Sequence, residues 1–300
     1  MKVVKKSSIV CTHIFLCLGV VLMLYPFVFA FLGMFKTIEG FYEVEILPVP
    51  DGIGYGISNL RIIFRRAEIY RSILITLGRF VWYAAISVLT SVLGGYAFAK
   101  VNFKFKKAAF YIIMSTMMIP GIALLIPQYL ELMRFPLVGG NDITGYGGVG
   151  FRDNMAVLFI TGWISAYNIF LVQQSLRQIG DDYREAAEID GAGFFRVIFS
   201  IYMPMLKPIV ALMILQTFIG QWNDYLFPVL FLPSARSLWP IGVLSVKIQS
   251  DYLYTAGTGG LMNYPMVMAM GVFMMIPPIA VYISCQKYFI QGITVGGVKS

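Results

Sequence analysis

The sequence predicts an all-α integral membrane protein, and two observations support that prediction. Of its 300 residues, 58% are hydrophobic and only 13% are charged, whereas soluble proteins carry about 25% charged residues. Several apolar runs also reach the roughly 20 residues that a helix needs to cross a bilayer. We therefore expect one bundle of six membrane-spanning helices, at about 9–34, 73–99, 108–130, 154–174, 205–230 and 264–288.

The first span follows a short basic N-terminus, as a secretory signal would. Its apolar run, from Ile9 to Phe35, is longer than the roughly 7–15-residue core of a signal peptide, and no cleavage site ends it. We expect a retained helix, so that residues 1–72 form this span and an extracytoplasmic loop. The basic stretch 59–71 at the end of that loop is typical of a helix lying on the membrane surface.

Basic residues between the second and third spans indicate the orientation. Cytoplasmic loops of membrane proteins are enriched in lysine and arginine, and Lys100, Lys104, Lys106 and Lys107 lie close together there. An even number of spans then places both termini in the cytoplasm. The arginines of the first loop weaken this bias without reversing it.

Prolines interrupt the third span at Pro120 and Pro127 and the sixth at 277–278. Such breaks are tolerated where neighbouring helices or a cavity satisfy the freed backbone groups. Broken helices therefore suit a protein with a pathway through its spans.

We expect no catalytic residue, metal site or cofactor in this chain. The glycine-rich loop 134–154 lacks the Gly-Lys-Ser/Thr ending of a phosphate-binding loop. Cys11, Cys17 and Cys285 all lie in apolar runs, which argues against a disulfide framework or zinc site. The net charge of +8 reflects the basic ends of the loops rather than nucleic-acid binding.

An ordered, partly charged segment separates the fourth and fifth spans. Asp182 and Glu185 fit a capping box at a helix start, and Gly191 or Gly193 suits its end, which predicts a short helix over 183–190. This helix is either an ordinary connector or a helix that enters a groove on a partner. Its small central residues, Ala186 and Ala187, favour close approach by another chain.

The same segment resembles the loop signature of permease subunits of ATP-binding-cassette importers. Glu185-Ala186-Ala187, Gly191, Ile201 and Pro204 match that signature, and Met203 departs from it where the family usually has leucine. The stretches FIGQWNDYLFP and QKYFIQGITVGGVKS resemble the carbohydrate-uptake group, in particular its second permease, of the maltose and glycerol-3-phosphate kind.

The resemblance implies a six-transmembrane-helix type I importer permease fold with a cytoplasmic coupling helix. A core permease domain would span 73–290, with a coupling loop at 175–204, and 291–300 would form a cytoplasmic tail that reaches the ATPase or frays. Glu185 would pair with a basic residue of the ATPase, and Gly191 would permit the turn. The implied ATPase-coupling residues are Glu185, Ala186, Ala187, Asp190, Gly191 and Pro204.

The implied partners are a second homologous permease, an ABC ATPase dimer that binds ATP and magnesium, an extracytoplasmic solute-binding protein, a sugar or oligosaccharide substrate, and membrane lipid. A sugar phosphate, polyol or other polar solute is the alternative cargo. An ion-coupled carrier or a membrane enzyme would need ionisable groups that act together within the spans. Only Arg79 and Asp224 lie there, and we expect Arg79 to reach outward and neither to have a partner.

Polar residues in the fifth span mark a candidate substrate pathway, because polar groups inside a bilayer are costly and often functional. Aromatic faces beside amides and a carboxylate suit a sugar, although an aromatic anchor at the membrane surface explains the same residues. In relatives the other permease can supply most sugar contacts. The candidate pathway residues are Gln221, Trp222, Asn223 and Asp224, with Asn168 in the fourth span as a weaker candidate.

Overall fold

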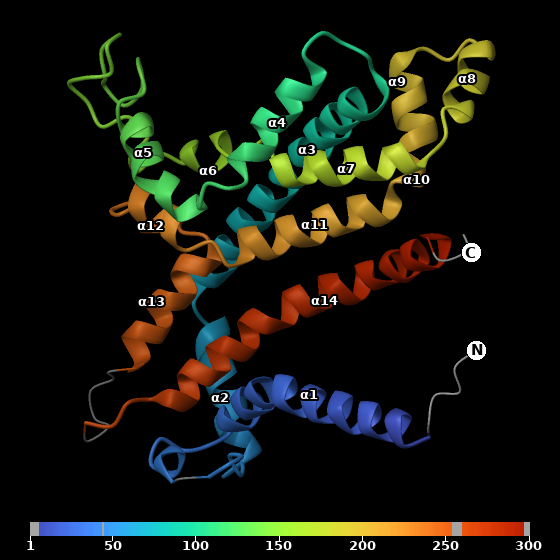
Figure 1. Ribbon diagram of the computed structural model, residues 1–300. Coiled ribbons are helices and arrows are strands. Elements are labelled where there is room, and N and C mark those ends of the chain that lie inside the picture. The colour runs from blue at the N-terminus through green and yellow to red at the C-terminus, as the bar shows by residue number, and fades with distance from the viewer. Residues whose placement is uncertain (1–5, 44, 254–259, 297–300) are drawn as a thin grey trace. The chain divides into compact units, whose positions relative to one another are not determined.

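The computed structural model describes residues 6–43, 45–253 and 260–296, and the described secondary structure is entirely helical (Figure 1). Several helices follow one another with only one to four residues between them. The helices are α1 (Lys6–Gly33), η1 (Gly40–Tyr42), α2 (Ile53–Phe64), α3 (Ala67–Lys100), α4 (Lys106–Thr116), α5 (Gly121–Met133), α6 (Val157–Ile160), α7 (Ala166–Gln178), α8 (Asp182–Ile189), α9 (Phe194–Arg196), η2 (Val197–Tyr202), α10 (Met203–Met205), α11 (Lys207–Trp222), α12 (Leu226–Phe231), η3 (Arg236–Leu238), α13 (Ile241–Leu253) and α14 (Tyr264–Gly296).

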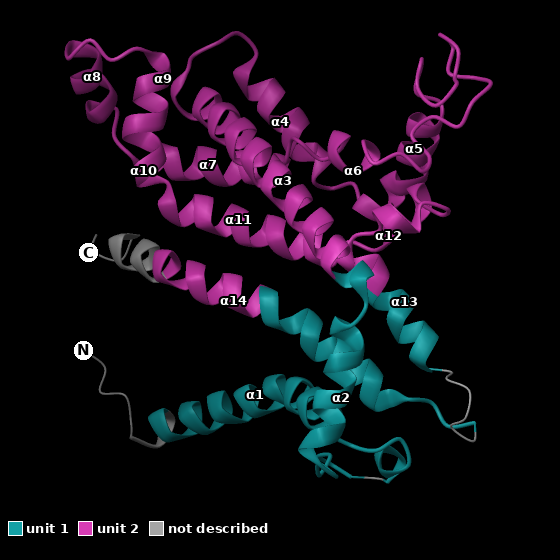
Figure 2. Cartoon of the chain, turned by 180° about the vertical axis from the view of Figure 1, so that it is seen from behind, with its two compact units in different colours: residues 1–69, 245–277 teal, residues 70–244, 278–300 magenta. Residues whose placement is uncertain are grey.

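The chain divides into two compact units (Figure 2), residues 1–69 with 245–277 and residues 70–244 with 278–300. In the first unit, Phe41 stacks on Tyr264 with ring centroids 5.3 Å apart, and Phe64 packs edge-on against Phe273. Lys36 is buried and donates to Glu45 at 2.7 Å. The expected division at 1–72, 73–290 and 291–300 follows topology rather than packing, and it stays a prediction; residues 297–300 lie outside the described part of the chain.

The second unit contains two apolar clusters. One joins α3, α7, α8, η2 and α11, and the other joins α3, α5, α6, α12 and α13 with the loop before α6. α7 lies against both α4 and α11 (Figure 1). Gly95 permits the close approach of α3 and α7, because a Cβ there would lie 2.4 Å from Cγ1 of Val172.

Within the described residues, three helices, in α1, α3 and α14, are long and apolar enough to cross a membrane alone, and the number rises to five if each bent pair counts as one span. α1 is apolar on all sides and largely exposed, as expected for a helix that faces lipid. α4 and α5 form one bent pair, with 95° between them. Pro120 precedes α5 and cannot donate a backbone hydrogen bond, so it ends the ladder there.

The predicted fourth span, 154–174, is wrong as a continuous helix. α6 has four residues, residues 161–165 are not helical, and α7 begins at Ala166. Gly162 adopts φ +76, which a helix cannot contain. The Ser165 hydroxyl accepts a hydrogen bond from the Asn168 backbone at 3.2 Å and so starts a new helix.

The predicted fifth span, 205–230, is also interrupted. α11 ends at Trp222 and α12 begins at Leu226. The amide of Asn223 donates to the carbonyl of Ile219 at 3.1 Å, and such local bonds compete with the helical ladder. The expected surface helix over 59–71 is likewise divided, between the end of α2 and the start of α3.

Candidate functional site

The short helix α8 forms as expected, but its start differs from the predicted capping box. Asp181, not Asp182, occupies the N-cap position, and no side chain caps it. Asp181 Oδ1 instead accepts a hydrogen bond from Lys100 Nζ at 2.8 Å. The capping-box prediction is therefore wrong, and the side chain of Glu185 is not used to begin the helix.

Lys100, the last residue of α3, ties that helix to the start of α8. Its ammonium group also donates to the Ile179 carbonyl at 2.6 Å and lies 5.7 Å from the centre of the Tyr202 ring. The hydrogen bond from Lys100 lowers the pKa of Asp181 below its ordinary value. The sequence marked Lys100 only as an indicator of orientation, and its role at this junction was missed.

Gly191 ends α8 in a Schellman motif, in which two backbone N–H groups beyond the helix bond back to its last turn. Gly191 N donates to Glu188 O at 3.1 Å, and Ala192 N donates to Ala187 O at 2.9 Å. Gly191 has φ +77, whereas Gly193 has φ −72. The predicted glycine stop is confirmed, and Gly191 is the glycine that makes it.

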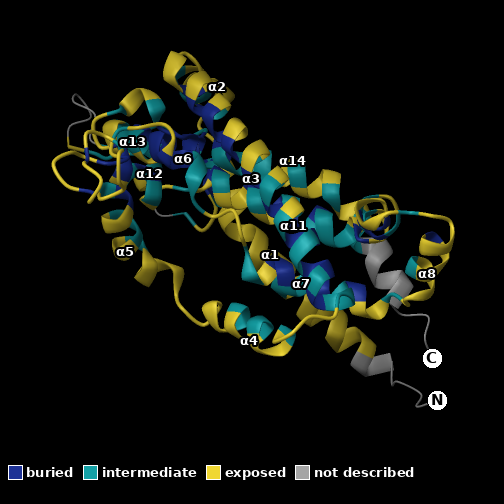
Figure 3. Ribbon diagram, turned by 90° about the horizontal axis from the view of Figure 1, so that it is seen from above, coloured by how far each residue is buried: buried dark blue, intermediate teal, exposed yellow. Residues whose placement is uncertain are grey.

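The two faces of α8 differ sharply. Ala187 is only 6% exposed and belongs to the apolar cluster that joins α3, α7, η2 and α11. On the other face, the Glu185 side chain is 63% exposed and Ile189 is 86% exposed; Ala186 and Asp190 are exposed as well. Much of α8 is accordingly exposed (Figure 3). One face of this helix is therefore fixed to the protein, while an acidic and apolar face is free.

The segment after α8 shares its core. Val197, Ile198 and Tyr202 of the π-helix η2 are buried in the same cluster as Ala187. Pro204 follows in α10, exposed, and the helical segment Phe194–Met205 meets α11 at 82°. Packing thus links a displacement of α8 to the start of α11, because close-packed cores transmit strain.

Arg79 and Asp224 form an ion pair, which corrects the expectation that neither would have a partner. Arg79 Nη2 lies 2.6 Å from Asp224 Oδ2, with Arg79 2% and Asp224 22% exposed. Arg79 Nε donates to the Leu158 carbonyl at 3.3 Å. Arg79 therefore faces the interior of its unit and does not reach outward, and the interruption between α11 and α12 supplies its counter-charge.

The other candidate pathway residues lie in different environments. Trp222 is buried and stacks on Phe218 with centroids 5.6 Å apart, and Asn223 is bound to its own helix. Among the described residues, Gln221 Oε1 is buried with no hydrogen-bond partner. Asn168 donates to Ser87 at 3.1 Å, about two helical turns along α3 from Arg79. The structure therefore joins Asp224 to α3 but does not bring Asn168 to Asp224.

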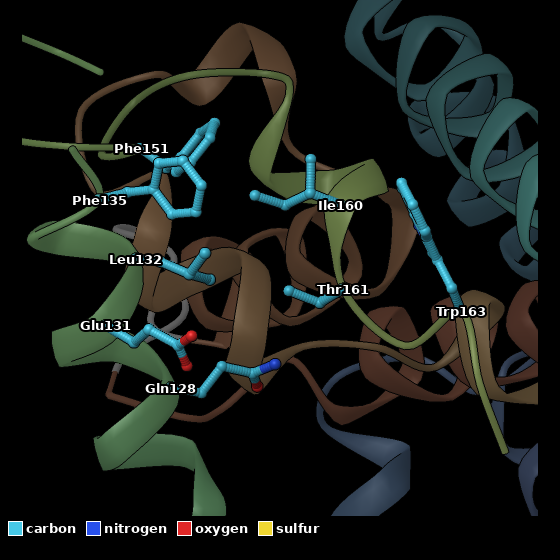
Figure 4. Close-up of a pocket in the computed structure, with 8 residues that line it drawn as sticks. All are labelled: Gln128, Glu131, Leu132, Phe135, Phe151, Ile160, Thr161 and Trp163. Atoms are coloured by element: carbon cyan, nitrogen blue, oxygen red, sulfur yellow. The ribbon is translucent and has the colours of Figure 1, made fainter. Parts of the chain in front are cut away.

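Two polar residues, Gln128 in the third predicted span and Glu131 just after its expected end, were missed altogether. Gln128 and Glu131 lie on α5 and line a cavity (Figure 4). Their spacing of three residues places both on one face of a helix. Because polar side chains in an apolar run are themselves unusual, that spacing was a usable signal.

The chain is similar to proteins of known family. Residues 91–295 match the family model described as binding-protein-dependent transport system inner membrane component. The arabinooligosaccharides transport system permease protein of Bacillus subtilis is 29% identical over 93% of this chain and 91% of its own length. The sn-glycerol-3-phosphate transport system permease protein of Yersinia enterocolitica is 28% identical over 94% of each.

Two further proteins are similar to this chain. The melibiose/raffinose/stachyose import permease protein of B. subtilis is 29% identical over 72% of this chain and 71% of its own. A crystal structure of a bacterial ABC transporter involved in the import of the acidic polysaccharide alginate has a chain that superposes with a TM-score of 0.76, over 96% of this chain and all of that chain, at 23% identity. At that identity the match shows the fold alone.

Proposed function

Since the chain belongs to the binding-protein-dependent transport system inner membrane components, we propose that it carries a sugar or oligosaccharide into the cell. It is the non-catalytic permease subunit of an ATP-binding-cassette importer and a multi-pass protein of the inner membrane. A second permease, an ATPase and a solute-binding protein complete such an importer. In our proposal the second permease is homologous, the ATPase is a dimer, and both termini of this chain lie in the cytoplasm.

The exposed face of α8 is the observation that carries the proposed coupling. Glu185 is free of any capping role and stands on a helix that ends in a rigid turn at Gly191. A charge-assisted hydrogen bond between Glu185 and a basic group of the ATPase contributes about 1.5–3 kcal/mol. Ala186, Asp190 and the exposed Ile189 complete the docking surface.

The buried face of α8 transmits the movement of the ATPase. When ATP draws the two ATPase subunits together, α8 moves with them, and Ala187 carries η2 and the start of α11 along. Lys100 conveys the same displacement to α3 through Asp181. The ATPase must bind one permease conformation better than the other, because only a difference in affinity shifts the equilibrium.

The substrate pathway, in this proposal, passes Gln221, Trp222, Asn223 and Asp224, with Asn168 as a further contact. The interruption after α11 supports it, because irregular backbone within a membrane protein occurs where a cavity or neighbouring protein satisfies it. The oxygens of Gln221 and Asn168 are buried and unpaired within the described structure, so both lack a partner that a substrate hydroxyl would supply.

The cargo has one alternative of the same class: a sugar phosphate, a polyol or another polar solute. The relatives include both oligosaccharide and sn-glycerol-3-phosphate permease proteins. The Arg79–Asp224 pair alone would suit an ion-coupled carrier, but the family assigns the chain to importers driven by ATP. A different class of protein is therefore set aside.

Reconstitution tests the proposal. The tagged chain, with the subunits that co-purify with it and the cognate solute-binding protein, is placed in liposomes, and uptake of labelled maltose, raffinose and glycerol 3-phosphate is measured with and without internal ATP. ATP-dependent uptake of a saccharide supports the carbohydrate assignment. Uptake of glycerol 3-phosphate alone supports the alternative cargo, and uptake that requires an ion gradient but no ATP would contradict both.

A further inference from the structure

A cavity of about 460 Å³ opens beside α5 within the second unit (Figure 4), and none of the predicted pathway residues lines it. This volume lies within the range of small-molecule sites, roughly 300–1,000 Å³. Four elements form it: α5, the glycine-rich loop that follows, the end of α6, and the irregular segment after α6. Its lining residues are Gln128, Glu131, Leu132, Phe135, Phe151, Ile160, Thr161 and Trp163.

Polar groups occupy one part of the cavity and aromatic rings another. Figure 4 shows the Gln128 amide and the Glu131 carboxylate extending from α5 toward Thr161, with the rings of Phe135 and Phe151 to one side and Trp163 across the cavity. An amide both donates and accepts hydrogen bonds, and a carboxylate accepts several. Hydroxyl groups can satisfy all of these, while the rings offer apolar faces.

The aromatic walls are fixed in place by their own contacts. Trp163 Nε1 donates to the Phe159 carbonyl at 2.6 Å, and its ring meets Trp82 edge-on at 6.3 Å. Phe135 packs edge-on against Phe151 at 5.3 Å, and Asn141 Nδ2 donates to the Phe135 carbonyl at 3.0 Å. The rings therefore need little rearrangement to receive a ligand, which lowers the cost of binding.

The polar side chains of the cavity, by contrast, have unused hydrogen-bonding groups. Within the described part of the chain, neither Gln128 nor Glu131 makes a side-chain hydrogen bond or an ion pair. Arg134, the basic residue just after α5, lies over the ring of Tyr146 at 5.2 Å and is not among the lining residues. Glu131 is thus the only charged residue of the lining.

We propose that this cavity is a contact site for a neutral saccharide on its way through the importer. A carboxylate with no lining cation repels phosphate, sulfate or uronate groups, whereas it accepts hydrogen bonds from sugar hydroxyls. The fixed rings cover the apolar faces of a sugar ring. The inference rests on the proposed carbohydrate function and goes further, because it assigns this chain its own substrate contacts and favours an uncharged cargo.

The test compares cavity variants in the complete importer reconstituted in liposomes. Trp163→Ala and Glu131→Gln are expected to lower ATP-dependent uptake of maltose or raffinose by about tenfold, the effect of one lost hydrogen bond or stacking contact. Trp163→Phe keeps a ring and should retain most uptake. Glu39→Gln, an exposed carboxylate with no side-chain role at η1, is the control and should transport at the wild-type rate.

A labelling measurement reports binding at the cavity itself. Thr161→Cys, in a chain whose native cysteines are replaced by serine, is exposed to a maleimide reagent in the purified complex. Protection by maltose or raffinose, and not by glycerol 3-phosphate, supports the proposal. Protection by glycerol 3-phosphate alone overturns it, as does loss of the second permease from the Trp163→Ala complex, which would make the cavity an interface between subunits.

The two proposals fail in different ways. If the wild-type importer takes up no saccharide, the carbohydrate function fails and this inference falls with it. If the wild type imports a saccharide and both Trp163→Ala and Glu131→Gln import it equally fast, only the cavity assignment is wrong.

Discussion

Removing the charge of Asp224 should destabilise the protein, because it leaves the Arg79 guanidinium buried without a counter-charge. Asp224→Asn keeps the size of the side chain and changes only its charge. Breaking one side of a buried ion pair costs about 3–5 kcal/mol. Asp224 is 22% exposed and Arg79 only 2%. Because Arg79 also keeps its bond to the Leu158 carbonyl, we expect the lower end, about 3 kcal/mol.

The surroundings of Arg79 explain why no other group compensates for the loss of the Asp224 charge. Its second terminal nitrogen, Nη1, is already buried with no hydrogen-bond partner among the described residues. Arg79→Met combined with Asp224→Leu removes both charges, and replacing a buried pair by apolar groups is often neutral. The double variant should therefore be more stable than Asp224→Asn alone.

The assay is the fraction of detergent-purified, fluorescently tagged protein that stays folded and monodisperse after heating. A loss of about 3 kcal/mol changes the ratio of folded to unfolded protein by more than about 100-fold. The control is Lys247→Gln, which breaks a partly exposed pair with Asp251 and should cost under about 1 kcal/mol. The expected cost of an unpaired Arg79 is contradicted if Asp224→Asn is as stable as that control, or if the double variant is the least stable of all.

Two further predictions follow from single contacts, and a third concerns the orientation of the chain in the membrane. Gly95→Val should lower the free energy of unfolding by about 1–3 kcal/mol, because it overpacks α3 against α7. Gly78→Ala, with no atom within 4 Å of its new Cβ, should leave it unchanged. Equal melting temperatures of the two variants would contradict this packing. The pKa of Asp181 is lowered in the folded protein, so its stabilising effect is complete above the ordinary aspartate value, near pH 4, and is lost as the pH falls through the lowered pKa. Asp181→Asn should remove this part of the acid sensitivity, measured as the folded fraction between about pH 6 and pH 3. Unchanged acid sensitivity would count against the Lys100 contact. For the orientation, single cysteines are placed in a chain without its native cysteines. A cysteine at the exposed Ile143 should react with an impermeant maleimide from outside, and a cysteine at Ile189 should not; the reverse labelling pattern would overturn the topology. Gly145 is unsuitable because its Cβ would lie 2.0 Å from the Arg134 carbonyl.

Much of the fold follows from local signals in the sequence. α1, α3 and α14 correspond to long apolar runs, and α8 with its glycine stop follows from residue types that act on their own neighbours. The fold and family expected from the loop signature are confirmed. In each case the deciding interaction lies within a few residues along the chain.

What the sequence did not reveal depends on contacts between distant residues or on competition between local ones. Arg79 and Asp224 are separated by 145 positions, so their pairing could not be read from the pattern of either span. The interruptions at Gly162 and Asn223 lie within apolar runs whose composition alone favours a continuous helix. Asp181 also contacts the end of α3 instead of capping α8, because tertiary contacts override a local preference.

Co-purification of the ATPase with this permease tests whether α8 couples the chain to a separate ATPase. Glu185→Ala should reduce the affinity for the ATPase by about tenfold or more, the equivalent of about 1.5–3 kcal/mol. Gly191→Val should reduce it further, because a β-branched residue resists the φ of +77 found there. Gly193→Val is the matched control: its φ is −72 and no atom lies within 4 Å of the new Cβ.

We expect the ratio of ATPase to permease to fall in Glu185→Ala and Gly191→Val, while all four variants insert into the membrane at wild-type levels. Gly193→Val and Glu39→Ala should keep the wild-type ratio. If Glu185→Ala and Gly191→Val both retain the ATPase in full and transport at the wild-type rate, α8 is only a connector between two spans and the coupling claim is contradicted.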